Sequence, residues 1–170
     1  MSKTKNITFL GVGIALYVVM SMFLNIPLIG HIRLDCGYIV YSVYLVVFGW
    51  LGIPVGVIGC FFKGYISDGW IPFTWMIGQV IIGVVCSIVF SKTENIWIRI
   101  VAIVLSVFFG IAIVSSGLSA LIFHLPIGLK IFKGCVASVA DSLAMIVGLP
   151  IGNRVKKEFG RIVGDADGDS

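Results

Sequence analysis

Several ionisable side chains of this chain stand inside long apolar segments, where they could do chemistry. The clearest case is Asp141, which lies within the run GCVASVADSLAMIVG. On a helix it would lie about 12 Å from Lys133, too deep for its carboxylate to reach water. A charge at such a depth is costly, so it pairs with another group or faces a cavity. We expect Asp141 to contact a ligand or to act in gating, with a structural ion pair as the alternative.

Other polar side chains stand near the ends of neighbouring apolar segments, where they could hydrogen-bond a ligand. The candidates are Arg33, Asp35, Lys63, Asp68, Gln79, His124 and Lys133. For Arg33, Lys130 and Lys133, snorkelling to the membrane interface is an alternative interpretation. We therefore expect Asp141→Asn to weaken ligand binding more than Lys130→Ala does.

Aromatic side chains accompany these polar groups. The candidates for contact with a flat ligand are Tyr38, Tyr41, Trp70 and Trp75. An interfacial aromatic belt is the alternative for any one of them. The run DGWIPFTW, from Asp68 to Trp75, combines an acid with two indoles and is a candidate pocket wall or lid. Carboxylates, amines and aromatic rings together predict a site for a flat, hydrogen-bonding heterocycle.

Motifs for other chemistries are missing from the sequence. There is no GxxxxGK[ST] phosphate loop, so the chain cannot by itself couple transport to ATP hydrolysis. HExxH is absent and the four cysteines stand singly, so neither a metal nor a cofactor is expected. The one candidate for a hydrolytic site is the Ser115-Ser116-Gly117 run with His124, and it lacks the G-x-S-x-G turn.

The elements that position these residues must lie in a membrane. The chain has 170 residues, of which 59% are hydrophobic and 12% charged, and its mean hydropathy is +1.11. Soluble domains carry about 25% charged residues, so this chain needs lipid as its solvent. The net charge is +4, but the basic residues flank apolar runs and form no patch interleaved with aromatics. No nucleic-acid partner is expected.

Apolar runs separated by Gly, Pro and polar breaks predict an all-α membrane protein with six transmembrane helices. The expected helices cover about 7–24, 37–51, 53–67, 73–91, 98–120 and 131–151. The first is expected to be retained, because no cleavage site of the A-x-A type follows it. Residues 1–152 then form one membrane domain with a polar connection from Pro27 to Asp35, and residues 153–170 form a charged, mobile cytoplasmic tail.

Basic residues give this bundle an orientation. Six spans put both termini on one side, and eight of the twelve Lys and Arg residues fall on that side: Lys3, Lys5, Lys92, Arg99, Arg154, Lys156, Lys157 and Arg161. The positive-inside rule makes that side cytoplasmic. The expected topology is therefore N-in and C-in, with the candidate ligand residues at the outer ends of the helices.

Three features resemble the substrate-binding subunits (S-components) of energy-coupling factor (ECF) vitamin transporters. They are the small-xxx-small spacing of Gly11 and Ala15 in the first helix, the entry IPLIGHIRLDCGYIV to the second, and the loop SDGWIPFTW before the fourth. The chain looks closest to the riboflavin-type branch. The first of the small residues is Gly here, where the family usually has Ala.

The resemblance implies a multi-pass protein of a prokaryotic plasma membrane that captures a vitamin at its outer face, with the first outer loop closing over the ligand. It implies two kinds of protein partner, an ECF transmembrane coupling protein and two cytoplasmic ATPases. Gly11 and Ala15 would dock against the coupling protein. Such subunits are thought to topple in the bilayer to release substrate inside.

Riboflavin is the first ligand that this resemblance suggests. Pyridoxine, a pyrimidine precursor and a deazaguanine related to queuine fit the polar and aromatic candidates as well. Two other classes of protein stay open as alternatives to a transport subunit: a small intramembrane enzyme and a self-assembling structural membrane protein.

Overall fold

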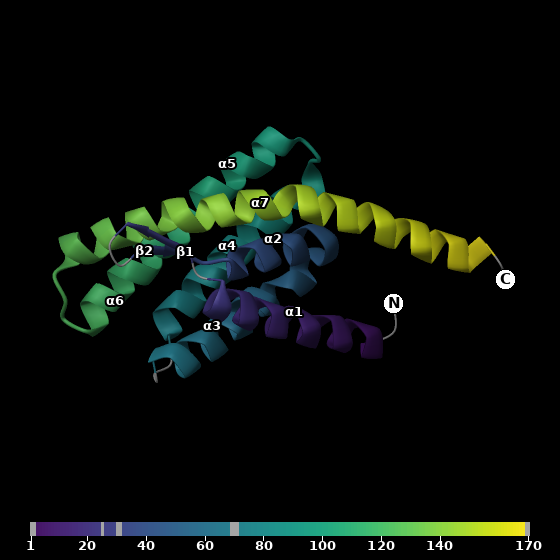
Figure 1. Cartoon of the computed structure of the whole chain (residues 1–170). Coiled ribbons are helices and arrows are strands. Elements are labelled where there is room, and N and C mark those ends of the chain that lie inside the picture. The colour runs from purple at the N-terminus through teal and green to yellow at the C-terminus, as the bar shows by residue number, and fades with distance from the viewer. Residues whose placement is uncertain (1–2, 25, 30–31, 69–71, 169–170) are drawn as a thin grey trace.

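Helices make up almost all of the chain in the computed structural model, which describes residues 3–24, 26–29, 32–68 and 72–168 and the side chains within 6–24, 34–67 and 72–159 (Figure 1). The α-helices are α1 (Lys3–Phe23), α2 (Gly37–Phe48), α3 (Ile53–Asp68), α4 (Phe73–Lys92), α5 (Ile96–Val107), α6 (Ser116–Ile122) and α7 (Ile127–Gly168). A 3-10 turn, η1 (Gly49–Gly52), joins α2 to α3, and a π-helix, η2 (Phe108–Ser115), joins α5 to α6.

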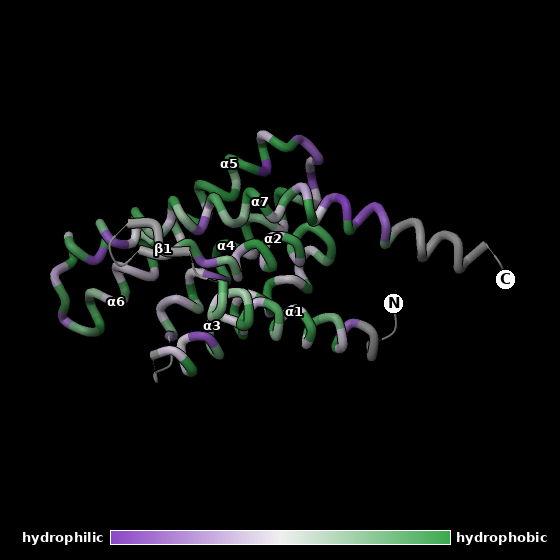
Figure 2. The backbone as a smooth tube through the Cα atoms, in the orientation of Figure 1, coloured by the Kyte–Doolittle hydropathy of each residue, from purple (hydrophilic) through white to green (hydrophobic). Residues whose placement is uncertain are grey.

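Five helical segments in the described part of the chain are long and apolar enough to cross a membrane. They are Asn6–Phe23, Gly37–Ser67, Phe73–Lys92, Ile96–Ile122 and Ile127–Phe159. Many large apolar side chains on these helices are exposed, among them Phe23, Leu105 and Phe132, as expected for surfaces that face lipid. Figure 2 shows hydrophilic residues gathered at the connection between α4 and α5 and along the part of α7 beyond the bundle. The protein is therefore an all-α membrane bundle.

The segment Gly37–Ser67 contains a chain reversal. Gly49 has φ +55°, a left-handed conformation that glycine adopts without steric cost. Beyond the turn, a Cβ added at Gly52 would lie 2.8 Å from the Tyr44 backbone, and one at Gly56 would lie 2.4 Å from the Tyr41 ring. Helices α2 and α3 therefore run back along each other as a tight hairpin, as the Gly-Pro turn in the sequence predicts.

The connection between α1 and α2 is more regular than expected. Instead of an irregular polar link, it contains two antiparallel strands, β1 (Ile26–Ile29) and β2 (Ile32–Leu34). Ile26 pairs with Leu34 and Pro27 with Arg33. The β-branched and apolar residues in this segment suit a strand, a preference that the polar flanks obscured. Strand β2 packs against α7.

The segment expected to be one helix over 98–120 is divided. Helix α5 gives way to the π-helix η2 and then to α6. Within η2 the Ser115 hydroxyl donates to the Gly110 carbonyl at 2.8 Å. A Cβ added at Gly78 of α4 would lie 2.7 Å from the Gly110 oxygen, so α4 and η2 approach closely through glycines.

Helix α7 is much longer than the expected 131–151. It begins directly after Pro126 and continues through Pro150 to Gly168, a length of about 63 Å at 1.5 Å per residue. Beyond the bundle it carries the charged residues that were expected to form a mobile tail. Figure 1 shows both chain ends on the same side of the bundle and the turn between α6 and α7 on the opposite side.

Helices α2 and α7 share the most extensive contact between two helices in the described structure. Small residues allow it, since a Cβ added at Gly148 would lie 2.6 Å from the Ile39 carbonyl oxygen. Leu45 of α2 and Met145 of α7 are fully buried in the core that results. This core fixes the position of Asp141, one helical turn before Met145.

Candidate substrate-binding site

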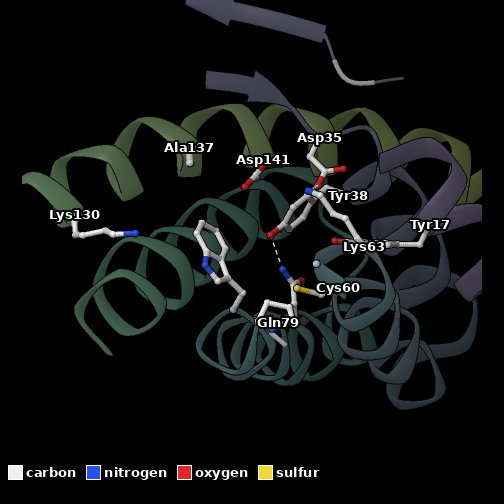
Figure 3. A pocket seen from close by; sticks show the side chains of 12 residues that line it. Tyr17, Asp35, Tyr38, Cys60, Lys63, Gln79, Lys130, Ala137 and Asp141 are labelled. Atoms are coloured by element: carbon white, nitrogen blue, oxygen red, sulfur yellow. Dashed lines mark hydrogen bonds and ion pairs between the residues drawn. The ribbon is translucent and has the colours of Figure 1, made fainter. Parts of the chain in front are cut away.

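A cavity of about 370 Å³ lies between the helices (Figure 3), beside the first part of α7, which is away from the chain ends (Figure 1). Its lining comes from α1 to α4 and α7, and comprises Tyr17, Asp35, Tyr38, Cys60, Lys63, Gly64, Pro72, Trp75, Gln79, Lys130, Ala137 and Asp141. This volume is within the range of about 300–1,000 Å³ typical of small-molecule sites. The cavity extends along α7, with Lys130 at one end and Asp141 towards the other.

Asp35, just before α2, is held by three elements. Its Oδ1 accepts the Ser21 hydroxyl of α1 at 2.6 Å and the Gly37 backbone N–H of α2 at 2.9 Å. Its Oδ2 accepts from the Lys63 ammonium of α3. The Asp35 side chain is 8% exposed and that of Lys63 is 32% exposed, so the ammonium is the open part of the pair. Three of the helices around the cavity thus converge on one carboxylate.

Gln79, one and a half turns into α4, lines the cavity and connects α4 to α2 through hydrogen bonds. Its side-chain amide donates to the Tyr38 hydroxyl, and its backbone carbonyl accepts the Tyr41 hydroxyl at 2.7 Å. The amide oxygen of Gln79 is buried without a hydrogen-bond partner among the described residues. A buried acceptor in this state has unused capacity for a donor.

Asp141 is 6% exposed and lines the same cavity from α7. Its carboxylate makes no hydrogen bond or ion pair with any residue that the structure describes. Figure 3 shows it between Ala137 and the Asp35–Tyr38 group. A buried carboxylate without a donor is costly, which marks it as a candidate ligand contact.

Six of the predicted site residues lie together in this cavity: Asp35, Tyr38, Lys63, Trp75, Gln79 and Asp141. They come from four different segments of the chain, so their meeting depends on the packing of the bundle. The expectation of a site that combines carboxylates, an ammonium and aromatic rings corresponds to this cavity.

Three other predicted residues lie outside its lining. Tyr41 is fully buried beneath Gln79, where it serves packing. His124 is exposed in the turn after α6 with φ +51°, and Lys133 is exposed on α7. Lys133 does not line the cavity, although it lies three residues after Lys130 and four before Ala137, which do. Trp70 and the side chains of Arg33 and Asp68 lie outside the described residues.

Sequence reasoning missed several lining residues, above all Tyr17 on α1. Tyr17 and Ser21 are polar, four residues apart in an apolar helix, and both are buried. That spacing puts them on one helix face and is a signal for an inward polar stripe. Lys130 was expected to be marginal, yet it is half-buried and lines the cavity. It is therefore not a neutral control for Asp141.

The hydrolytic alternative finds no support in the geometry. The Ser116 hydroxyl is buried and donates to the Ile111 carbonyl at 2.9 Å. His124 is exposed beyond the end of α6, and no hydrogen bond joins it to Ser116. A nucleophile needs a base within hydrogen-bond reach, which these two residues do not provide.

The face of α1 that carries Gly11 and Ala15 points away from the bundle. Both residues are exposed, and a Cβ added at Gly11 would meet nothing within 4 Å. Gly13, two residues on, faces the opposite way, because a Cβ there would lie 2.6 Å from the Tyr44 ring. The small residues at 11 and 15 therefore leave a shallow outer surface on α1.

Comparison with known proteins gives both the fold and the family of the chain. The structure superimposes on the crystal structure of the S-component for biotin from an ECF-type ABC transporter with a TM-score of 0.67. The match covers 92% of this chain and 95% of that chain, at 13% sequence identity, so it is a likeness of fold. The family model described as ECF-type riboflavin transporter, S component, matches residues 1–157. The chain belongs to this family of membrane transporter subunits, which are not enzymes.

Curated relatives match over most of their length. A UPF0397 protein of Streptococcus thermophilus is 28% identical over 158 residues, which cover 86% of this chain and 87% of that protein. A UPF0397 protein of Lactobacillus johnsonii is 23% identical over 157 residues, which cover 85% and 84%. These names specify no ligand, so the identity of the substrate has to be argued from the cavity.

Proposed function

We propose that this protein captures a vitamin or a related flat heterocyclic micronutrient from outside the cell and delivers it for ATP-driven uptake. The observation that carries the proposal is the cavity in which Asp35, Lys63 and Asp141 meet Tyr38 and Trp75. Aromatic faces suit a flat ring, and the charged groups suit its polar edge. A cavity of this chemistry in an S-component is best explained by substrate binding.

The proposed orientation rests on counting α2 and α3 as separate spans. The reversal at Gly49 supports this count, and six crossings would put both termini on one side of the membrane. The basic residues at that end, including Lys92 and Arg154, make it the cytoplasmic side by the positive-inside rule. The cavity at the other end opens towards the exterior, in the plasma membrane of a prokaryotic cell. Residues 1–152 form the membrane domain and 153–170 its charged cytoplasmic extension.

The protein partners are an ECF transmembrane coupling protein and two cytoplasmic ATPases. A small bundle without a phosphate loop needs an external source of energy. The exposed small residues Gly11 and Ala15 on α1 support docking of another helix at close range. Nothing in this role requires a metal or cofactor of the S-component itself.

Riboflavin is the first ligand to test, because the family description names it. Pyridoxine, a pyrimidine precursor and a deazaguanine remain alternatives for the same role. The purified chain should be screened by thermal stability against these compounds, and molecules that copurify with it should be identified by mass spectrometry. A ligand-dependent rise in melting temperature and copurification with an ATPase module support the proposal. The absence of both results would contradict it.

A further inference from the structure

Two hydrogen-bond acceptors that line the cavity, the Asp141 carboxylate and the Gln79 amide oxygen, lack a donor among the described residues. The Asp141 carboxylate is 6% exposed and unpaired among the described residues, and Gln79 is 1% exposed with its amide oxygen unpartnered. They come from α7 and α4, on opposite sides of the cavity. The Gln79 amide oxygen is shut off from bulk water, so a fixed donor would remove the cost of its burial.

The neighbouring Lys63 does not fill this need. Its ammonium is paired with Asp35, and no ion pair within 4 Å joins it to Asp141. The Asp35 carboxylate is satisfied by Ser21, Gly37 and Lys63, so Asp141 is the carboxylate of the lining that still lacks a donor among the described residues.

The geometry of a carboxylate determines which ligand edge fits it. Its two oxygens accept best from two adjacent N–H groups, in a bidentate arrangement. The imide edge of a flavin has a single N–H between two carbonyl oxygens, and those oxygens would approach the carboxylate unfavourably. A ligand carboxylate would be repelled by Asp141. An amino group beside a ring N–H presents the matching pair of donors.

We propose, resting on the function proposed above, that the ligand presents an amino group and an adjacent ring N–H to Asp141. The 2-aminopyrimidinone edge of a guanine-type base has this pattern, and a 4-aminopyrimidine acquires it when its ring nitrogen is protonated. The amide oxygen of Gln79 accepts a further donor of the ring. Lys63 has three N–H donors and shares one with Asp35, so a ring carbonyl next to the donor pair can accept another.

Two analogues test this directly with the full chain in detergent. 7-Deazaguanine carries the donor pair, and 7-deazahypoxanthine has the same rings without the amino group; riboflavin is the third probe. Binding is measured by isothermal titration to the wild type, to Asp141→Asn and to Lys133→Gln, an exposed control on the same helix. We expect the wild type and Lys133→Gln to bind 7-deazaguanine at least tenfold more tightly than 7-deazahypoxanthine, and Asp141→Asn to lose most of that preference.

The analogue comparison on the wild type does not depend on any variant folding. Equal affinity of the wild type for the two deazapurines would overturn the inference. So would tight binding of riboflavin that is unchanged in Asp141→Asn, although the transport function would then stand. If none of the probes binds and the chain associates with no ATPase module, both this inference and the proposed function fail.

Discussion

The Lys63 ammonium of α3 donates to the Asp35 carboxylate at the start of α2, inside the cavity. This pair links the start of α2 to the last part of α3, while the turn around Gly49 links the other ends of these helices. Removing one member leaves the other as an uncompensated charge, which is more harmful than removing both.

Lys63→Met should therefore destabilise the bundle by about 1–3 kcal/mol, a value below that of a fully buried pair because the Lys63 side chain is 32% exposed. The double variant Lys63→Met with Asp35→Asn should recover part of this loss. Thermal melting of the four proteins in a double-mutant cycle measures the coupling. Strictly additive effects would show that the pair does not contribute to stability.

Replacing Gly11 or Gly13 of α1 by leucine should have different effects on folding. Gly13→Leu adds a side chain where a Cβ alone would lie 2.6 Å from the Tyr44 ring, so it should lower the melting temperature and the yield. Gly11→Leu meets open space and should leave folding and ligand binding intact. We expect it to abolish uptake by the assembled transporter, because it thickens the docking face of α1.

Uptake assays in cells and binding assays on purified protein separate these effects. Ala15→Leu, four residues along the same exposed face, should behave as Gly11→Leu does. If Gly11→Leu weakens ligand binding while uptake follows binding in proportion, the face of α1 that carries Gly11 and Ala15 serves the cavity and not the coupling protein.

Arg99, at the N-terminal end of α5, stabilises the side of the bundle opposite the cavity. Its guanidinium is buried and donates to the Thr93 and Phe90 carbonyls at 2.8 and 3.1 Å and to the Asn153 side chain at 2.8 Å. Lysine lacks this planar set of donors, so Arg99→Lys should cost about 2–3 kcal/mol of stability. Ligand affinity, measured by titration below the melting transition, should remain within twofold of the wild type. A large loss of affinity would mean that the two ends of the bundle are coupled.

Tyr41 is a control for the aromatic residues of the cavity. Tyr41→Phe removes the 2.7 Å hydrogen bond to the Gln79 carbonyl and should cost about 1 kcal/mol. Because Tyr41 does not line the cavity, ligand affinity should change little. Trp75→Ala, which removes a lining ring, should weaken binding at least tenfold. Titration of both variants with the copurified ligand compares them, and equal losses would contradict the assignment of the lining.

The sequence allowed the membrane class, the α2–α3 turn and six of the cavity residues to be predicted. Asp141 and Lys63 were found because a charge in an apolar run has few explanations. The strands β1 and β2 and the π-helix η2 were missed, since each depends on packing: β2 against α7, and Gly110 of η2 against Gly78 of α4. Helix α7 extends past residue 151 because its charged residues are compatible with a helix outside lipid, where hydropathy gives no signal.

Lys130 and Lys133 show a second limit of predicting the site from the sequence. They are equally close to the expected membrane interface, yet Lys130 lines the cavity and Lys133 is exposed. Position 133 lies three residues after 130 and four before 137, so helix periodicity puts all three near one face. What separates the two lysines is the packing around α7, which no single residue of the sequence reveals.

The location of the ligand is the central claim, and cysteine protection tests it most directly. Ala137→Cys places a thiol in the cavity lining, and Lys133→Cys places one on the exposed face of the same helix. Alkylation rates by a small maleimide are resolved by residue with mass spectrometry, with and without the copurified ligand. The account predicts that ligand slows modification at position 137 at least tenfold and leaves position 133 unchanged. Equal rates at position 137 with and without bound ligand would contradict it.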